Sequence, residues 1–217
     1  PLMARIQAWT TAADFFSSRK EFDRAVDGYN RAIALLTTRS PDLDFRLADT
    51  LIRAGRFQEA LDWAEGMQVS AHQSLIRGRA HLETGDSGEA LEDFTEANRL
   101  WPNNAYARYY TAVAAERQGQ IDRAIEEYRY AIRIDADATD AALRLTHYYL
   151  ARNEGRKALQ ILALTGPTNP AAFEVRLAIA RIGGRIGRPG YSANLFEGFA
   201  PESTAPAEGL AAAAPGT

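Results

Sequence analysis

The chain has 217 residues, of which 46% are hydrophobic and 24% charged, with a formal net charge of -3 and a pI near 5.7. This acidic balance argues against a general nucleic-acid binder, which usually carries a basic surface. The lack of cysteine excludes disulfides, thiol nucleophiles and cysteine-based zinc sites. The sequence has no apolar run of about 18 residues, so it predicts no membrane span.

The start of the sequence bears on the compartment. Residues 1–5 lack the basic-then-apolar plan of a secretory signal. The compartment stays undetermined: a cytoplasmic location is slightly favoured, and a periplasmic one stays open if a signal has been removed. Among the 25 lysines and arginines only Lys20 and Lys157 are lysines, a balance typical of proteins from GC-rich bacterial genomes.

A small residue returns along the chain with a period close to 34 residues. The members of this series are Ala25, Ala60, Ala90, Ala124 and Ala158. Residues four and seven positions after each alanine lie on the same helix face, so each set forms a seam. Self-similarity at this period predicts a stack of antiparallel helix pairs, with each alanine where two helices cross closely.

In chain order, the expected units are residues 6–39, 41–70, 71–104, 105–138 and 139–172. A truncated sixth or capping unit at 173–200 and a Pro/Ala-rich tail or linker at 201–217 follow them. The first helix of each unit is expected to end at a left-handed turn residue, namely Lys20, Gly55, Gly85, Gly119 and Asn153. The unit 41–70 is shorter than its neighbours and has Ala64 where others have a larger packing side chain, so its second helix should end early.

The clearest unit begins at His72 and carries Gly78, Ala90 and Phe94 in the repeated register, and the unit 105–138 matches nearly as well. This pattern resembles the tetratricopeptide repeat (TPR) family over nearly the whole chain except its tail. The resemblance implies an all-α, right-handed superhelical solenoid of antiparallel helix pairs.

The same resemblance implies a function. It indicates a non-catalytic protein–protein interaction module, an adaptor, scaffold or assembly factor, that binds a peptide or helix of a partner in its concave groove. The alternative is the targeting arm of a larger multidomain enzyme or signalling protein whose catalytic domain is not in this chain. No catalytic residue, cofactor or nucleic-acid partner is expected.

In the family, set positions of each first helix line the groove. Carried over, these positions give a partner-binding set of Phe45, Asp49, His72, Leu75, Arg79, Tyr106, Tyr109, Glu116 and His147. Tyrosine and arginine are enriched at binding hot spots, although some of these rings are also placed to pack between units. The chaperone-binding members hold the terminal carboxylate of a peptide with a clamp of Lys, Asn and Arg, and the corresponding positions of this chain lack that set. A generic salt bridge from Arg79 to a partner stays open.

The sequence offers further candidate sites. Arg181, Arg185 and Arg188 form a stripe that suits an acidic partner, or simply the solvated face of a capping helix. The acidic residues Asp135 and Asp137, with Asp140, lack a calcium-loop pattern and are expected to supply helix N-caps and favourable first-turn charge. His72 and His147 come from units two apart and predict no metal site.

A segment at 191–199 is a candidate for self-binding, so a homo-oligomer through the C-terminal segment is a further option.

Overall fold

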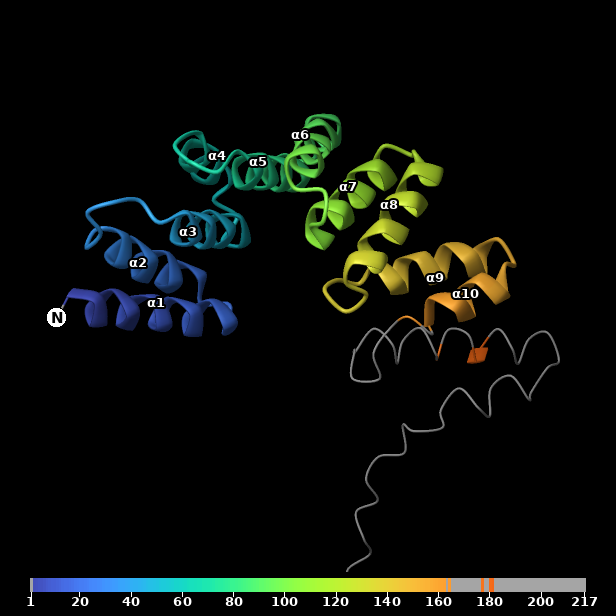
Figure 1. The fold of residues 1–217 in the computed structure, drawn as a ribbon, viewed down its shortest axis with the longest axis horizontal. Coiled ribbons are helices and arrows are strands. Elements are labelled where there is room, and N and C mark those ends of the chain that lie inside the picture. Colours follow the sequence, from blue (N-terminus) through green and yellow to red (C-terminus); the bar gives the residue numbers. More distant parts are fainter. Residues whose placement is uncertain (1, 163, 165–176, 178–179, 182–217) are drawn as a thin grey trace, which may run out of the picture.

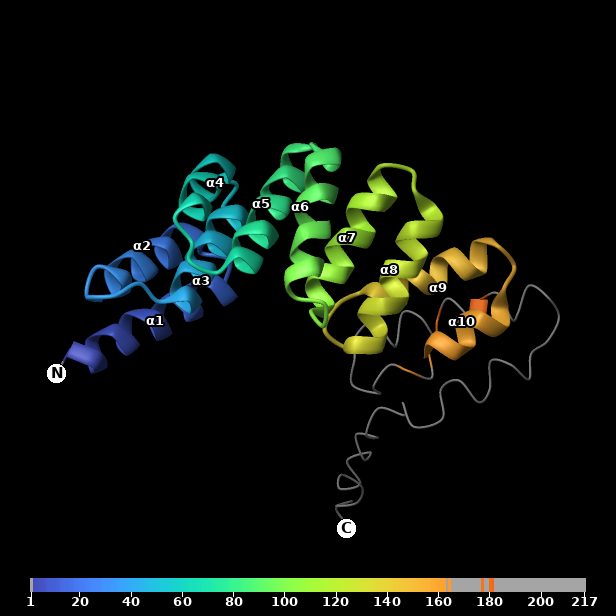
Figure 2. The same ribbon diagram turned by 45° about the horizontal axis from the view of Figure 1, so that its top comes forward.

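A computed structural model describes residues 2–162, 164, 177, 180 and 181, and within these ranges it contains helices and no strand (Figure 1). The helices are α1 (Leu2–Ser18), α2 (Phe22–Ile33), α3 (Pro41–Arg53), α4 (Phe57–Glu65), α5 (Ser70–Thr84), α6 (Ser87–Leu100), α7 (Ala105–Arg117), α8 (Ile121–Ile134), α9 (Ala141–Ala151) and α10 (Gly155–Leu162). Successive helices form antiparallel pairs that follow one another along a curved path (Figure 2).

The pairs stack with a constant order of contacts. Each second helix packs on its own first helix and on the first helix of the next pair, as α2 does on α1 and α3. Among the first helices, α5 also contacts both α3 and α7 directly. Because the first helices approach each other along the stack, they line its inner, concave side, which solenoids use for binding.

The expected alanine seam forms the tightest part of the core. The five alanines of the series are completely buried, and so are the rings of Phe94 and Tyr128 four residues after two of them. A Cβ added to Gly78 on α5 would lie 2.7 Å from the Phe94 ring on α6. This close approach explains why small residues recur where the helices of a pair cross.

The predicted turn residues all adopt the left-handed backbone conformation. Gly55, Gly85 and Gly119 have φ of 76°, 94° and 70°, and the two non-glycine members, Lys20 and Asn153, have φ of 63° and 59°. Each of them lies between the two helices of a pair. A left-handed residue reverses the chain in a short turn, which makes the two helices antiparallel neighbours.

The second pair departs from the others as expected. Helix α4 has 9 residues, whereas α6 and α8 have 14 each. The Arg39 guanidinium lies 5.0 Å from the Trp63 ring centre and donates a hydrogen bond to the carbonyl oxygen of Gly66. The prediction that the second helix ends early is confirmed, and Arg39 holds the loop that follows it.

The expectation for the acidic residues before α9 is wrong in part. Asp140 lies at the N-cap position, but its carboxylate makes no capping hydrogen bond and instead accepts one from Arg144 Nε at 3.1 Å. A charged donor one turn later competes successfully with the neutral main-chain N–H groups. Asp135 Oδ1 accepts a hydrogen bond from the main-chain N–H of Asp137 at 3.0 Å, within the loop before the helix.

Several expectations lie outside the described residues. These are the capping unit at 173–200 apart from residues 177, 180 and 181, including the whole segment 191–199, and the tail at 201–217. Within the described ranges, no helix is both long enough and apolar enough to cross a membrane.

Candidate functional site

Three first helices and one inter-pair connection enclose a cavity of about 630 Å³ on the inner side of the stack. Its lining residues are Asp42, Phe45, Asp49 and Arg53 from α3, His72, Leu75 and Arg79 from α5, Trp101 and Asn104 from the α6–α7 connection, and Tyr106 and Tyr110 from α7. We call this the aromatic cavity. Its volume lies in the range typical of ligand sites.

Aromatic rings from neighbouring pairs meet along one wall of the aromatic cavity. The ring centroids of Phe45 and His72 are 4.9 Å apart, and those of His72 and Trp101 are 5.9 Å apart. The Asn104 side chain accepts a hydrogen bond from the N–H of Ala107 at 2.9 Å and so fixes the start of α7. This cap sets the position of α7, and with it Tyr106, relative to the connection that carries Trp101.

Large aromatic side chains are exposed at the mouth of the cavity, together with the exposed charged residues Asp42 and Arg53. Tyr106 is 52% exposed and Trp101 is 44% exposed, although both are large hydrophobic residues. Leu75, in contrast, is buried in the core and contributes only to the floor. Exposed aromatic residues beside a cavity mark a surface suited to recognition.

His72 contributes an uncharged ring to this wall. Burial lowers the pKa of the imidazole below its ordinary value of 6.5 and outweighs the opposing effect of the Asp42 carboxylate. Its Nδ1 atom is buried and has no hydrogen-bond partner among the described residues. The wall is therefore neutral at pH 7.

The charged residues of the cavity are already engaged. Arg79 forms an ion pair with Asp49 across α5 and α3, and its guanidinium lies 5.1 Å from the Tyr110 ring centre on α7. Asp42 pairs with Arg46 Nε at 2.9 Å. Arg53 donates to the hydroxyl of Ser17 at 2.9 Å and is thereby directed toward α1.

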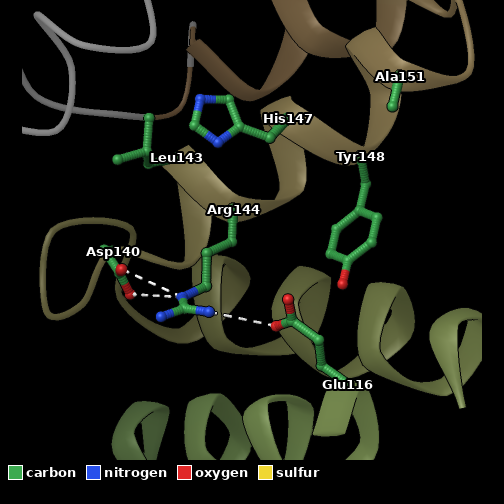
Figure 3. Close-up of a pocket in the computed structure, with 7 residues that line it drawn as sticks. All are labelled: Glu116, Asp140, Leu143, Arg144, His147, Tyr148 and Ala151. Atoms are coloured by element: carbon green, nitrogen blue, oxygen red, sulfur yellow. Dashed lines mark hydrogen bonds and ion pairs between the residues drawn. The ribbon is translucent and has the colours of Figure 1, made fainter. Parts of the chain in front are cut away.

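A second pocket of about 490 Å³ lies between α7 and α9 (Figure 3). It is lined by Glu116, Asp140, Leu143, Arg144, His147, Tyr148 and Ala151, and we call it the Glu116 pocket. Figure 3 shows the Arg144 guanidinium between the two carboxylates, at 3.2 Å from Glu116 and 3.1 Å from Asp140. The charges are thus bound up in a network that ties α7 to α9.

Tyrosine hydroxyls complete this network. The buried Tyr128 on α8 donates a hydrogen bond to Glu116 Oε2 at 2.7 Å, and burial raises the pKa of its hydroxyl further than the carboxylate does. Burial, with help from Glu116, also raises the pKa of Tyr148 to about 12. Both hydroxyls stay protonated and act as donors at neutral pH.

The structure brings together six of the nine residues expected in the groove. Phe45, Asp49, His72, Leu75, Arg79 and Tyr106 line the aromatic cavity, whereas Glu116 and His147 line the Glu116 pocket. Tyr109 lines neither of these two sites. Its ring packs at 5.2 Å from Tyr110 and 5.9 Å from Tyr128 between pairs, and the Arg144 guanidinium of the Glu116 pocket lies 5.8 Å from its ring centre.

Some lining residues escape the sequence pattern. Trp101 and Asn104 lie in the connection between pairs, so a rule based on first-helix positions cannot find them. The adjacent Pro102 marks the connection but not the direction of the indole. Tyr148 follows the expected groove residue His147 on α9 by one position, so the same rule does not find it.

The described residues show no group of histidines and carboxylates that could hold a metal ion. Of the arginine stripe, the structure describes only Arg181, which is exposed. Arg185 and Arg188 lie outside the described residues. The stripe therefore stays a prediction.

Comparison with known proteins identifies the repeat. A family model described as tetratricopeptide repeat matches residues 10–73 and 77–141, and a second model of the same description matches residues 115–182. A search of curated proteins finds no significant match. The two models together cover most of the chain.

Solved structures share the fold at low sequence identity. The TPR protein TTC0263 from Thermus thermophilus has a TM-score of 0.65 at 17% identity, over 81% of this chain and 97% of that one. The protein pilF from Pseudomonas aeruginosa has a TM-score of 0.60 at 16% identity, over 91% and 93% of the two chains. MamA from Desulfovibrio magneticus has a TM-score of 0.53 at 14% identity, over 80% and 96%. The expected all-α solenoid is confirmed, and the chain belongs to the tetratricopeptide repeat family.

Proposed function

We propose that this protein is a non-catalytic adaptor or assembly factor whose concave groove binds a segment of a partner protein at the aromatic cavity. The TPR fold is one of protein–protein interaction, since its solenoid creates an extended concave surface. The observation that carries the proposal is the cavity between α3, α5 and α7, with the exposed rings of Trp101 and Tyr106 at its mouth.

The geometry suits a protein ligand for two reasons. Most of the lining side chains sit on packed helices, so little conformational entropy is lost when a partner is bound. Aromatic rings that are both exposed and fixed in place supply large contact areas, which is the property of binding hot spots.

The test is capture of partners from a lysate of the source organism by three immobilised proteins. These are the wild type, the double variant Trp101→Ala/Tyr106→Ala, and the control Tyr130→Ala. Tyr130 is 43% exposed on α8 and lines no part of the aromatic cavity, so it matches Tyr106 in chemistry and exposure.

We expect at least one protein that the wild type and Tyr130→Ala capture and the double variant loses, as measured by quantitative mass spectrometry. The affinity of that protein, measured afterwards by titration calorimetry, should fall by about 30-fold or more in the double variant. The same captured proteins in all three samples would contradict the proposal.

A further inference from the structure

We propose that the aromatic cavity selects its partner by an uncharged aromatic side chain within the bound segment, and that the Asp49–Arg79 ion pair rejects carboxylates. This inference rests on the proposed function and adds the chemistry of the ligand. It concerns two residues that face each other from neighbouring helix pairs, α3 and α5.

The first step is the charge of the site. Two aspartates and two arginines line the aromatic cavity, so their formal charges cancel. The side chains of Asp49 and Arg79 are only 26% and 15% exposed. Either side chain would have to break the ion pair between them to become fully hydrated. A ligand carboxylate would have to compete with Asp49 for Arg79 and would lie beside the Asp49 charge, so it would gain little charge pairing.

The second step is the position of Arg79. Its guanidinium is held by Asp49 on one side and lies over the Tyr110 ring on another. These contacts join α3, α5 and α7 and make the arginine part of the wall. Arg53, the other lining cation, is directed to Ser17 and lies 4.8 Å from the Phe22 ring centre, toward α1 and α2.

The third step is the complementary surface. The neutral rings of Phe45, His72 and Trp101 form one wall, and Tyr106 lies at the mouth. Aromatic pairs in offset or edge-to-face geometry contribute about 0.5–1.5 kcal/mol beyond the area they bury. An inserted tryptophan, tyrosine or phenylalanine can make several such contacts at once. A charged side chain would lose its hydration against this wall and would face an Arg79 that is already paired with Asp49.

The decisive variant is Asp49→Asn, which keeps the shape of the side chain and frees the Arg79 guanidinium. The matched control is Asp42→Asn, because Asp42 lines the same cavity but pairs with Arg46. Both variants remove one negative charge from the site, so a difference between them reports on Arg79 and not on net charge. Circular dichroism checks that both retain the helical fold.

The probes are peptides selected by phage display against the wild type and then synthesised with either a free or an amidated C-terminus. We expect one position to be occupied by an aromatic residue and the affinity to be insensitive to amidation. Replacing that residue by glutamate should strongly weaken binding, without abolishing it, to the wild type and to Asp42→Asn. The glutamate peptide should bind Asp49→Asn about tenfold more tightly than it binds the wild type, the effect expected of one hydrogen-bonded charge.

The outcomes separate the two proposals. Selected peptides that require a free carboxylate, an acidic anchor or a proline in place of the aromatic residue would overturn this inference and leave the proposed function standing. Equal affinity of the glutamate peptide for Asp49→Asn and Asp42→Asn would overturn the role of the ion pair. If the wild type selects no peptide, or Trp101→Ala/Tyr106→Ala binds the selected peptides equally well, the proposed function itself fails.

Discussion

At the scale of single residues, the five turn positions share a left-handed backbone although they carry three different residue types. Glycine or asparagine closes a helix at low cost, and the 34-residue register carries this expectation even to Lys20, where the residue type gives no signal. A lysine at φ 63° has a steric cost that glycine avoids. The turn position is therefore set by the register, and the residue type only modulates its stability.

This difference leads to a prediction about turn stability. Lys20→Gly should raise the free energy of unfolding by about 1 kcal/mol, and Gly119→Ala should lower it by about 1 kcal/mol. No atom lies within 4 Å of a Cβ at Gly119, so the penalty there is one of backbone conformation alone. The control is Gly88→Ala within α6, whose added Cβ meets only Gln118 at 3.6 Å and should not destabilise the protein. Urea unfolding followed by circular dichroism measures all three, and a stabilising Gly119→Ala would contradict the argument.

A second prediction at this scale concerns His72, whose pKa is lowered by burial. As the pH falls through 6.5, the unfolded chain takes up a proton at this residue before the folded chain does. The free energy of unfolding should therefore decrease as the pH falls, and His72→Phe should weaken that decrease. Thermal unfolding between pH 5 and 8 compares the two proteins; the same pH dependence in both would show that His72 does not contribute.

At the scale of helices, the sequence predicts lengths and crossings better than the direction of side chains. The short α4 follows from the missing residues of its unit, and the crossing of α5 and α6 follows from Gly78 and Phe94 in register. The orientation of Trp101 and the partner chosen by Asp140 do not follow from register. Both depend on competition between several nearby groups, which only the folded arrangement decides.

The α5–α6 crossing yields a test of packing. Gly78→Ala would improve helix propensity by about 1 kcal/mol, but the added methyl group would lie 2.7 Å from the Phe94 ring. We expect a net destabilisation of about 1–2 kcal/mol, because overpacking a tight contact outweighs the gain in propensity. Combining the change with Phe94→Leu should recover part of the loss in a double-mutant cycle measured by urea unfolding. Strictly additive effects would mean that the two side chains do not compete for the same space.

At the scale of the whole molecule, the repeat period predicts the solenoid and its concave side, but not how that side is divided. The structure separates the expected groove into the aromatic cavity and the Glu116 pocket, with the half-buried Tyr109 packed into the core on α7 between them. This division arises from contacts between units, which a pattern defined within one unit cannot contain. The same contacts determine how stability is distributed along the stack.

Because each helix pair contacts mainly its neighbours, a destabilising substitution in one pair should leave the stability of distant pairs unchanged. The Tyr128–Glu116–Arg144 network is a suitable place to test this. Tyr128→Phe removes one donor from Glu116 and should cost about 1–3 kcal/mol, since a half-buried carboxylate is left with fewer hydrogen bonds. Stability in a solenoid is approximately a sum over units and their interfaces. Amide hydrogen exchange should therefore accelerate in α7, α8 and α9 and remain unchanged in α1 and α2. Equal acceleration along the whole chain would show instead that the stack unfolds as one cooperative unit.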